Sequence, residues 1–262
     1  MNKLEIILKG NSEGAAFAVS NKALAIVVDT LRASTTIPVM MLRGITEIIV
    51  AKEVSDARLA ADELNILLMG ERGCLKLEGF DFGNSPTEMN SIKSFAKSSV
   101  SFTSSTGARI IVESLGSECI IVGSPINARS VVKTILDLKQ IGKLKSDKII
   151  IIPAFTEGPI NKSKITEDQI GGLIIANEFS EKGISLSKEL EEEVSFLKNL
   201  LKKNTLNELL LQTVHGKKLV DLELSKDIEF CSRINQINTI PISFNDIHIL
   251  TNGIDTVRFS KM

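Results

Sequence analysis

Short apolar runs alternate with helical patterns through the first two-thirds of the chain. Most of these runs are continuous, without a polar residue at every second position. Such runs are typical of strands that are buried on both faces of a sheet. The pattern predicts strands at 4–8, 23–29, 46–51, 66–70, 99–103, 119–123 and 148–154. It therefore indicates a largely parallel sheet that is covered by helices.

Helical periodicity lies between the strands. In the segment 53–64, apolar residues recur at every third or fourth position and form one stripe of a helix. The paired Gly171 and Gly172 indicate that another helix packs closely against its neighbours. The predicted helices are 34–44, 53–64, 107–116, 127–140, 167–179 and 185–204.

Short helices and two short strands, in NTIPI and DIHIL, complete the chain. The prediction is therefore an α/β fold: a largely parallel sheet covered by helices on both faces, with a helical C-terminal portion. We expect a single domain over 1–262, with two lobes of about 1–145 and 146–262 as the alternative.

Polar clusters stand directly after four of the predicted strands, at 29–36, 71–73, 103–107 and 124–127. If the strands are parallel, all four clusters lie at the carboxyl edge of the sheet. Ligands bind at that edge in open α/β sheets. The sequence thus predicts one site to which all four clusters contribute.

The hydroxyl groups of these clusters suit an anion. Side-chain hydroxyls and the free N–H groups at the start of a helix bind phosphate well, because the helix dipole also favours negative charge. N-capping of the following helices is the alternative, since Ser and Thr are preferred caps. The candidate substrate-binding residues are Ser34, Thr35, Thr36, Thr103, Ser104, Ser105, Gly107, Ser124 and Asn127.

Carboxylates in the same clusters suit a metal ion. Asp29 and Glu71 each follow a strand and are expected to hold Mg²⁺ through oxygen ligands. Asp168, or Glu167 beside it, is the candidate third ligand. The alternatives are an N-cap for Asp29 and ordinary first-turn acids for the other two.

Two arginines complete the candidate catalytic set of Asp29, Arg32, Glu71 and Arg72. Arginine forms paired hydrogen bonds to phosphate, carboxylate or sulfonate. A structural ion pair between each arginine and a carboxylate is the alternative.

Two further candidates carry weaker signals. Asn84 and Ser85 lie in GFDFGNSP, which either contributes to the site or is a plain turn into a helix. His215, in VHGKK, is either a proton donor and phosphate contact or a structural or solvent-exposed residue.

The composition narrows the class of partner. The net charge is −1 and the chain has no Trp or Tyr, so it lacks the basic excess and most of the stacking groups of nucleic-acid-binding proteins. Neither a secretory signal nor a membrane span is expected, because charged residues interrupt the first apolar segment and no run approaches about 20 apolar residues. The three cysteines show no CxxC spacing, so neither a disulfide framework nor a zinc site is expected. We expect a cytoplasmic protein that binds neither nucleic acid nor a membrane, and leave a homo-oligomer open.

Several standard motifs are absent. The chain contains no P-loop, no GxGxxG fingerprint and no GxSxG elbow. Leu31 stands two residues after Asp29, where aspartyl phosphatases carry a second aspartate, so that pattern is also missing.

Taken in order, the motifs from about residue 23 to 241 resemble the 2-phosphosulfolactate phosphatase family. They are VVDTLRASTT, GERG, EGFDFGNSP, TSSTGAR, GSPINA, EDQIGG and HGKKLVDLELSKDIEFCSRIN. The resemblance implies an α/β phosphoric monoester hydrolase. It also implies Mg²⁺-dependent hydrolysis of 2-phospho-3-sulfolactate to sulfolactate and phosphate, a step towards coenzyme M.

The chain departs from the family pattern inside the predicted site. Thr106 and Ala108 replace the Asn and the last Thr of a TTNGT-like loop, and Cys74 stands where Gly is more usual. The substrate is therefore expected to be 2-phospho-3-sulfolactate or a closely related phosphorylated hydroxy acid. Whether Asp29 is a metal ligand or a covalent nucleophile stays open. A non-catalytic module that binds a small phosphorylated metabolite is the alternative function.

Overall fold

The computed structural model describes residues 4–158, 160 and 165–261. Within this part of the chain, eleven strands form one sheet. The strands are β1 (Glu5–Leu8), β2 (Leu24–Val28), β3 (Glu47–Val50), β4 (Leu67–Arg72), β5 (Leu75–Lys76), β6 (Ser99–Thr103), β7 (Cys119–Val122), β8 (Lys148–Pro153), β9 (Pro241–Ser243), β10 (Ile247–Ile249) and β11 (Asp255–Lys261).

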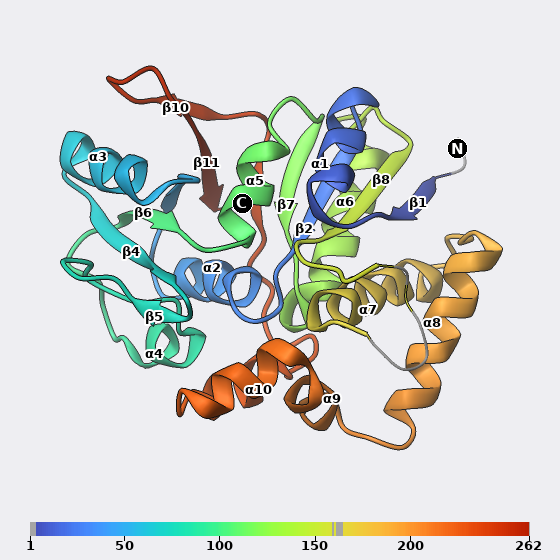
Figure 1. The fold of residues 1–262 in the computed structure, drawn as a ribbon. Coiled ribbons are helices and arrows are strands. Elements are labelled where there is room, and N and C mark those ends of the chain that lie inside the picture. Colours follow the sequence, from blue (N-terminus) through green and yellow to red (C-terminus); the bar gives the residue numbers. More distant parts are fainter. Residues whose placement is uncertain (1–3, 159, 161–164, 262) are drawn as a thin grey trace.

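Helices connect the strands and make up most of the C-terminal third (Figure 1). They are α1 (Asn11–Ser20), α2 (Ala33–Leu42), α3 (Val54–Leu64), α4 (Pro86–Ser91), α5 (Gly107–Glu113), α6 (Ala128–Gln140), α7 (Glu167–Glu181), α8 (Lys188–Leu201), α9 (Leu206–Gln212), α10 (Val214–Asp221) and α11 (Ser225–Cys231), with a 3₁₀ turn at Pro125–Asn127.

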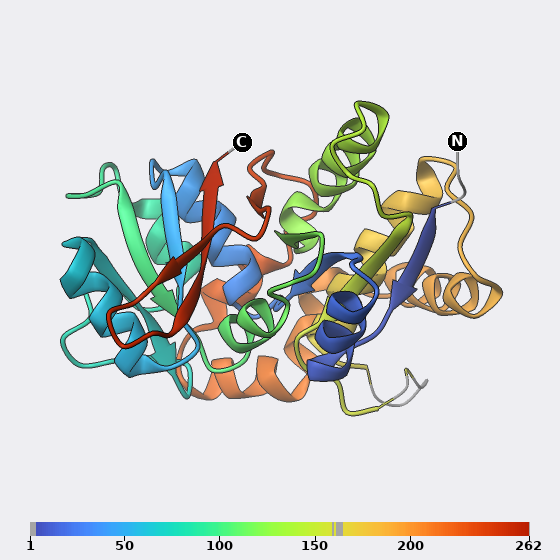
Figure 2. The same cartoon turned by 90° about the horizontal axis from the view of Figure 1, so that it is seen from above.

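The sheet consists of two parallel groups of strands. One group has the order β1-β8-β2-β7 and the other has the order β3-β6-β4. Strands β9 and β11 run antiparallel to their neighbours and join the groups, while β10 pairs with β11 and β5 pairs with β4. In Figure 2 the two groups lie on either side of the C-terminal strands.

Helices cover both faces of the first group. Along β2, Leu24 and Ile26 pack into a core cluster with α6 and α7. The alternate residues Ala25 and Val27 pack into a second cluster with α1, α2 and α5. This two-sided burial explains the continuous apolar runs in the sequence.

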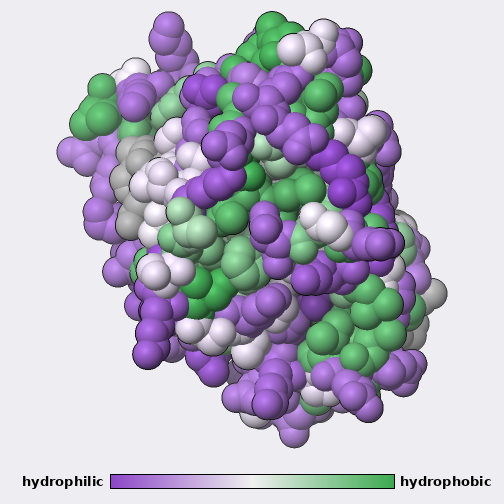
Figure 3. Space-filling model, turned by 90° about the vertical axis from the view of Figure 1, so that its left-hand side faces the viewer, coloured by the Kyte–Doolittle hydropathy of each residue, from purple (hydrophilic) through white to green (hydrophobic). Residues whose placement is uncertain are grey.

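The second cluster also extends to the second group of strands. Ile37 of α2 and Ile110 of α5 share it with Met69 and Phe102, so these two helices contact both groups. Helix α3 covers the other face of the second group through a separate cluster that includes Leu68. Charged and polar side chains cover most of the surface on this side, with smaller hydrophobic areas between them (Figure 3).

The predicted fold class is confirmed. The seven predicted strands and six predicted helices occur within a few residues of their expected bounds, and the C-terminal portion is largely helical. The single-domain assignment stays a prediction. No helix in the described ranges is long and apolar enough to cross a membrane.

Three elements were missed. The segment of α1 carries Gly14 and several small polar residues, which favour helix weakly. Strand β5 has only two residues. In β11, Val257 and Phe259 are buried and alternate with polar residues, which is the signature of a strand with one buried face rather than a continuous apolar run.

The glycine pair of α7 brings this helix against the end of β2, as predicted. A Cβ atom on Gly171 would collide with the Thr30 hydroxyl and lie 2.9 Å from a Val28 methyl group. A Cβ atom on Gly172 would lie 2.8 Å from Leu8. The absence of a side chain at Gly171 therefore lets the start of α7 approach the polar loop after β2, and its absence at Gly172 lets α7 approach β1.

We predict that Gly171→Ala destabilises the protein by about 1–3 kcal/mol, because the added methyl group overpacks a contact that has no free volume. The higher helix propensity of Ala offsets part of this loss. Urea unfolding measures the change, with Ser180→Ala at the exposed end of the same helix as the control. Equal or greater stability of the Gly171 variant would contradict the packing argument.

Candidate active site

A cavity of about 530 Å³ lies beside the loops that follow β2, β4 and β6, and helices α7 to α10 complete its wall. Residues far apart in the sequence meet here, because the C-terminal helices lie across the ends of both strand groups (Figure 1). The polar residues that line it are Asp29, Arg32, Glu71, Asn84, Ser105, Thr106, Glu157, Thr166, Glu167, Asp168, Gln212, Thr213, His215 and Lys218.

Asp29 is buried at the start of the loop between β2 and α2. The loop is fixed by local hydrogen bonds: the Asp29 N–H donates to Ser34 Oγ over 2.9 Å, and the Ala33 N–H donates to the Asp29 carboxylate over 3.3 Å. A Cβ atom at Gly107 would lie 2.5 Å from Asp29 Oδ2. Glycine at position 107 therefore allows the loop after β6 to approach this carboxylate.

Glu71, at the end of β4, is held by three donors. Its carboxylate accepts hydrogen bonds from the Cys74 N–H and the Ser105 N–H, each over 2.7 Å, and from the Ser105 hydroxyl over 3.1 Å. The loop 103–107 was predicted to bind the substrate anion. In the structure the N–H and hydroxyl of Ser105 in this loop donate to Glu71, and the predicted contact of the loop with the substrate stays a prediction.

Asp168 and Glu167 form the first turn of α7 and are buried. Asp168 accepts hydrogen bonds from the Thr30 N–H over 2.7 Å and from the Phe155 N–H over 3.0 Å. It thereby links the ends of β2 and β8 to α7, which places a third and a fourth carboxylate at the cavity.

The grouped carboxylates raise one another's pKa. Burial, followed by the negative charge of Glu71, raises the pKa of Asp29 from 3.8 to about 7. Burial and then the charges of Asp29 and Glu167 raise the pKa of Asp168 well above its usual range. Burial also raises the pKa of Glu167. Each of these shifts disfavours the charged form of the carboxylate, which a nearby cation would stabilise.

Arg32 brings positive charge to the cavity wall. Its guanidinium donates to the Asp227 carboxylate over 2.7 Å and to the Cys74 carbonyl over 2.6 Å. The ion pair predicted as the alternative role of Arg32 thus exists, but its partner is Asp227 of α11 rather than a carboxylate of its own cluster.

Arg72 points elsewhere and does not line the cavity. It donates to the carbonyls of Glu71 and Lys52 and to the Thr103 hydroxyl. Among the described residues it has no carboxylate partner. Its hydrogen bonds link β4 and β6 to the end of β3. Its predicted catalytic role stays a prediction.

Several predicted hydroxyls have local partners away from the cavity lining. Thr35 donates to the Thr30 carbonyl, Thr36 donates to the Arg32 carbonyl, Thr103 donates to the Lys52 carbonyl, and Ser104 accepts from the Ala108 N–H. These bonds fix the two loops. Ser105, by contrast, lines the cavity.

The cluster after β7 lies outside the cavity lining. Asn127 accepts from the Ser124 N–H over 2.9 Å and donates to the Thr239 carbonyl over 3.2 Å. These contacts attach the 3₁₀ turn to the segment before β9. The predicted substrate contacts of Ser124 and Asn127 stay predictions.

Asn84 and Ser85 have different surroundings. Asn84 lines the cavity, is 4% exposed, and its Oδ1 has no hydrogen-bond partner among the described residues. Ser85 caps α4 and donates to Asp227 over 2.6 Å. A buried polar atom without a partner costs free energy, so Asn84 is suited to a ligand.

His215 lines the cavity, and its predicted contact with the substrate stays a prediction. Its Nε2 is 3.6 Å from Cys74 Sγ, and its Nδ1 is 4.0 Å from the Glu167 carboxylate. Burial and then the charges of Arg32 and Lys218 lower its pKa to about 4. His215 is therefore neutral at pH 7.

Lys218 and Asp227 were not predicted as site residues, although both lie in the segment HGKKLVDLELSKDIEF, which resembles the family. The clearest sequence signal for these two residues was that their segment is one of those that resemble the family. Phe155 and Glu157, which follow β8, were also missed as cavity residues.

Comparison with known proteins places the chain in a family. A model described as 2-phosphosulpholactate phosphatase matches residues 13–246. The chain belongs to this family. Its predicted membership, and with it the class of phosphoric monoester hydrolase, is confirmed.

Individual relatives agree with this placement. The chain is 32% identical over 229 residues to 2-phosphosulfolactate phosphatase of Methanocaldococcus jannaschii, covering 85% of this chain and 90% of the relative. It is 31% identical over 218 residues to a probable 2-phosphosulfolactate phosphatase of Carboxydothermus hydrogenoformans, covering 82% and 84%. A probable 2-phosphosulfolactate phosphatase of Clostridium tetani is 30% identical over 224 residues, covering 85% and 90%.

The raised pKa of Asp29 predicts how stability depends on pH in the metal-free protein. Asp29 binds its proton more tightly in the folded state, where its pKa is about 7, than in the unfolded chain, where the ordinary value of 3.8 applies. The folded state therefore loses stability as pH rises between these values, by about 2–4 kcal/mol in total. Urea unfolding at about pH 5 and about pH 8, with a chelator present, measures this loss.

Asp29→Asn provides the comparison, because the amide keeps the shape of the side chain and does not titrate. The variant should lose this part of the pH dependence and be the more stable of the two proteins at the higher pH. The same pH dependence in both proteins would show that Asp29 is not the group responsible.

Proposed function

We propose that the chain is a Mg²⁺-dependent phosphatase that hydrolyses 2-phospho-3-sulfolactate, or a closely related phosphorylated hydroxy acid, to the hydroxy acid and phosphate. The family and the names of its relatives support the reaction class. The substrate and the metal are supported by the charges and donors of the cavity.

The observation that carries the proposal is the meeting of Asp29 and Glu71 at one cavity beside Arg32. The two carboxylates come from different strand groups, and the negative charge of Glu71 raises the pKa of Asp29. A dianionic phosphate ester would be repelled from such a wall unless a cation neutralised it. Carboxylates that face a phosphate ester are therefore best explained by a divalent metal.

The donor set fits Mg²⁺. No group of three or more His, Cys, Asp or Glu side chains in the described ranges is arranged to hold a metal ion by itself. Mg²⁺ commonly binds through one or two carboxylates and takes its other ligands from substrate phosphate and water. Asp29 and Glu71 would hold the ion, with Asp168 as a further or water-mediated partner. When bound, Mg²⁺ would polarise the phosphoryl group.

The other residues of the cavity have complementary roles. Arg32 donates N–H groups to an anionic oxygen of the substrate, and Lys218 adds positive charge on the same wall. The amide of Asn84 supplies a buried polar contact. Neutral His215 donates or accepts a hydrogen bond without adding charge. A substrate with several anionic groups uses all of these contacts.

The raised pKa of Asp29 favours the ligand role over the nucleophile role. A carboxylate that holds a proton at neutral pH is a poor nucleophile, whereas a cation beside it restores the charged form. Asp29 is accordingly proposed as a metal ligand that also fixes the loop after β2.

We predict phosphate release from 2-phospho-3-sulfolactate in the presence of Mg²⁺, and its loss when a chelator is added. Asp29→Asn and Glu71→Gln should each lower kcat/KM by about 100-fold or more, since each removes a charged ligand. The measurement is phosphate release from a panel of phosphorylated 2-hydroxy acids with and without Mg²⁺. The control is Asp62→Asn, an exposed acid on α3.

Undiminished turnover by Asp29→Asn would rule out the metal-ligand role. Tight binding of the same esters without any turnover would instead favour the non-catalytic binding module.

The two arginines should behave differently when each is changed to Lys, which keeps the charge but loses the planar fork. Arg32→Lys should lower kcat/KM about 10- to 100-fold, which corresponds to about 1.5–3 kcal/mol for a hydrogen bond to a charged group. Arg72→Lys should lower the melting temperature and leave kcat/KM per folded molecule within about twofold, because its bonds join strands outside the cavity. Measuring kcat/KM and the melting temperature of both variants tests this prediction. A loss of kcat/KM in Arg72→Lys but not in Arg32→Lys would contradict it and assign Arg72 to the site.

A further inference from the structure

A buried acid on α11 contacts the cavity arginine. Asp227 Oδ2 lies 2.7 Å from Arg32 Nη1, and each of the two side chains is 3% exposed. The two residues are 195 positions apart in the chain. An ion pair so far from water is costly to form, so stability alone is a weak reason for a protein to contain one.

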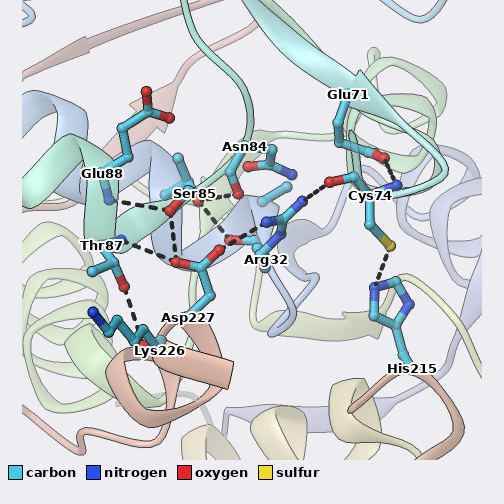
Figure 4. Close-up of polar contacts among 12 residues, drawn as sticks. Arg32, Glu71, Cys74, Asn84, Ser85, Thr87, Glu88, His215, Lys226 and Asp227 are labelled. Atoms are coloured by element: carbon cyan, nitrogen blue, oxygen red, sulfur yellow. Dashed lines mark hydrogen bonds and ion pairs between the residues drawn. The ribbon is translucent and has the colours of Figure 1, made fainter. Parts of the chain in front are cut away.

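The guanidinium is fixed at two points. Nη1 donates to Asp227, and Nη2 donates to the Cys74 carbonyl. Figure 4 shows the guanidinium between these partners. A guanidinium has five N–H groups, and the described residues provide partners for two of them. The remaining N–H groups belong to a side chain that lines the cavity.

The second oxygen of Asp227 holds a different part of the site. Oδ1 accepts a hydrogen bond from the Ser85 hydroxyl over 2.6 Å and from the Thr87 N–H over 3.3 Å. Ser85 directly follows Asn84, whose buried Oδ1 has no partner among the described residues. One carboxylate therefore fixes both Arg32 and the turn that carries Asn84 (Figure 4).

We propose that Asp227 is a positioning residue, which orients Arg32 towards the anionic group of the substrate and fixes the turn that carries Asn84. The inference deepens the proposed function and rests on it for the substrate, since Arg32 is taken as an anion-binding group of the same cavity. Asp227 does not touch the substrate. Asp227 acts by fixing the direction in which the N–H groups of the Arg32 guanidinium donate hydrogen bonds.

The kinetic test combines substitution with chemical rescue. Asp227→Asn keeps the shape of the side chain and removes its charge, and should lower kcat/KM about tenfold or more, mainly through a higher KM. Arg32→Ala leaves a gap between Asp227 and the Cys74 carbonyl. Free guanidinium ion, added well below the concentration that unfolds the protein, should restore part of the activity of Arg32→Ala. It should restore none in the double variant Arg32→Ala/Asp227→Asn.

Asp221→Asn, an exposed acid at the end of α10, is the matched control and should retain the original kcat/KM. A purely structural role for Asp227 predicts a lower melting temperature with kcat/KM per folded molecule unchanged. It also predicts equal rescue in both backgrounds. Either of these results would overturn the proposal.

A binding experiment separates this inference from the proposed reaction. With Mg²⁺ present, inorganic phosphate should raise the melting temperature of the original protein and of Asp221→Asn, and should have a much smaller effect on Arg32→Ala and Asp227→Asn. This outcome supports the anion-orienting pair even when no phosphate ester is hydrolysed. No phosphate effect on the original protein, or equal effects on all four proteins, would overturn it.

Discussion

The burial of several carboxylates around one cavity is the constraint on which the rest of the structure depends. Asp29, Glu71, Glu167 and Asp168 are each less than a tenth exposed, and burial together with mutual repulsion raises the pKa of three of them. Like charges in a medium of low polarity are tolerated only when donors or cations compensate them. The fold supplies these donors from the backbone: Ala33 for Asp29, Cys74 and Ser105 for Glu71, and Thr30 and Phe155 for Asp168.

Each of these donors is available because of a particular feature of the fold. Close contact at Gly171 brings α7 to the loop after β2, and Gly107 lets the loop after β6 approach Asp29. Helices α2 and α5 pack against both strand groups, so the ends of β2 and β4 are held in one arrangement. The C-terminal helices then add Lys218 to the cavity lining and supply Asp227, which pairs with Arg32.

The sequence predicted well what depends on local pattern. Continuous apolar runs identified the buried strands, and the residues after them identified Asp29, Glu71, Ser105 and Asp168 as cavity residues. It did not predict which direction each polar side chain takes. Ser34 and Ser105 are the same residue type after parallel strands, yet one accepts from the Asp29 N–H and the other lines the cavity. The Arg32–Asp227 pair joins segments whose contact depends on tertiary packing, so no local pattern predicts it.

The net charge of the cavity wall also affects how an anionic substrate enters the cavity. Among the described residues, five acidic side chains line the wall: Asp29, Glu71, Glu157, Glu167 and Asp168. The basic side chains that line the described wall are Arg32, which is already paired with Asp227, and Lys218. A phosphate ester that enters such a cavity meets net negative charge, and this repulsion is largest in the parts from which water is excluded. Under the proposed function, Asp29 and Glu71 would hold a divalent cation, which would offset this negative charge. Arg32 and Lys218 would then distinguish among anions by charge and by the direction of their N–H groups.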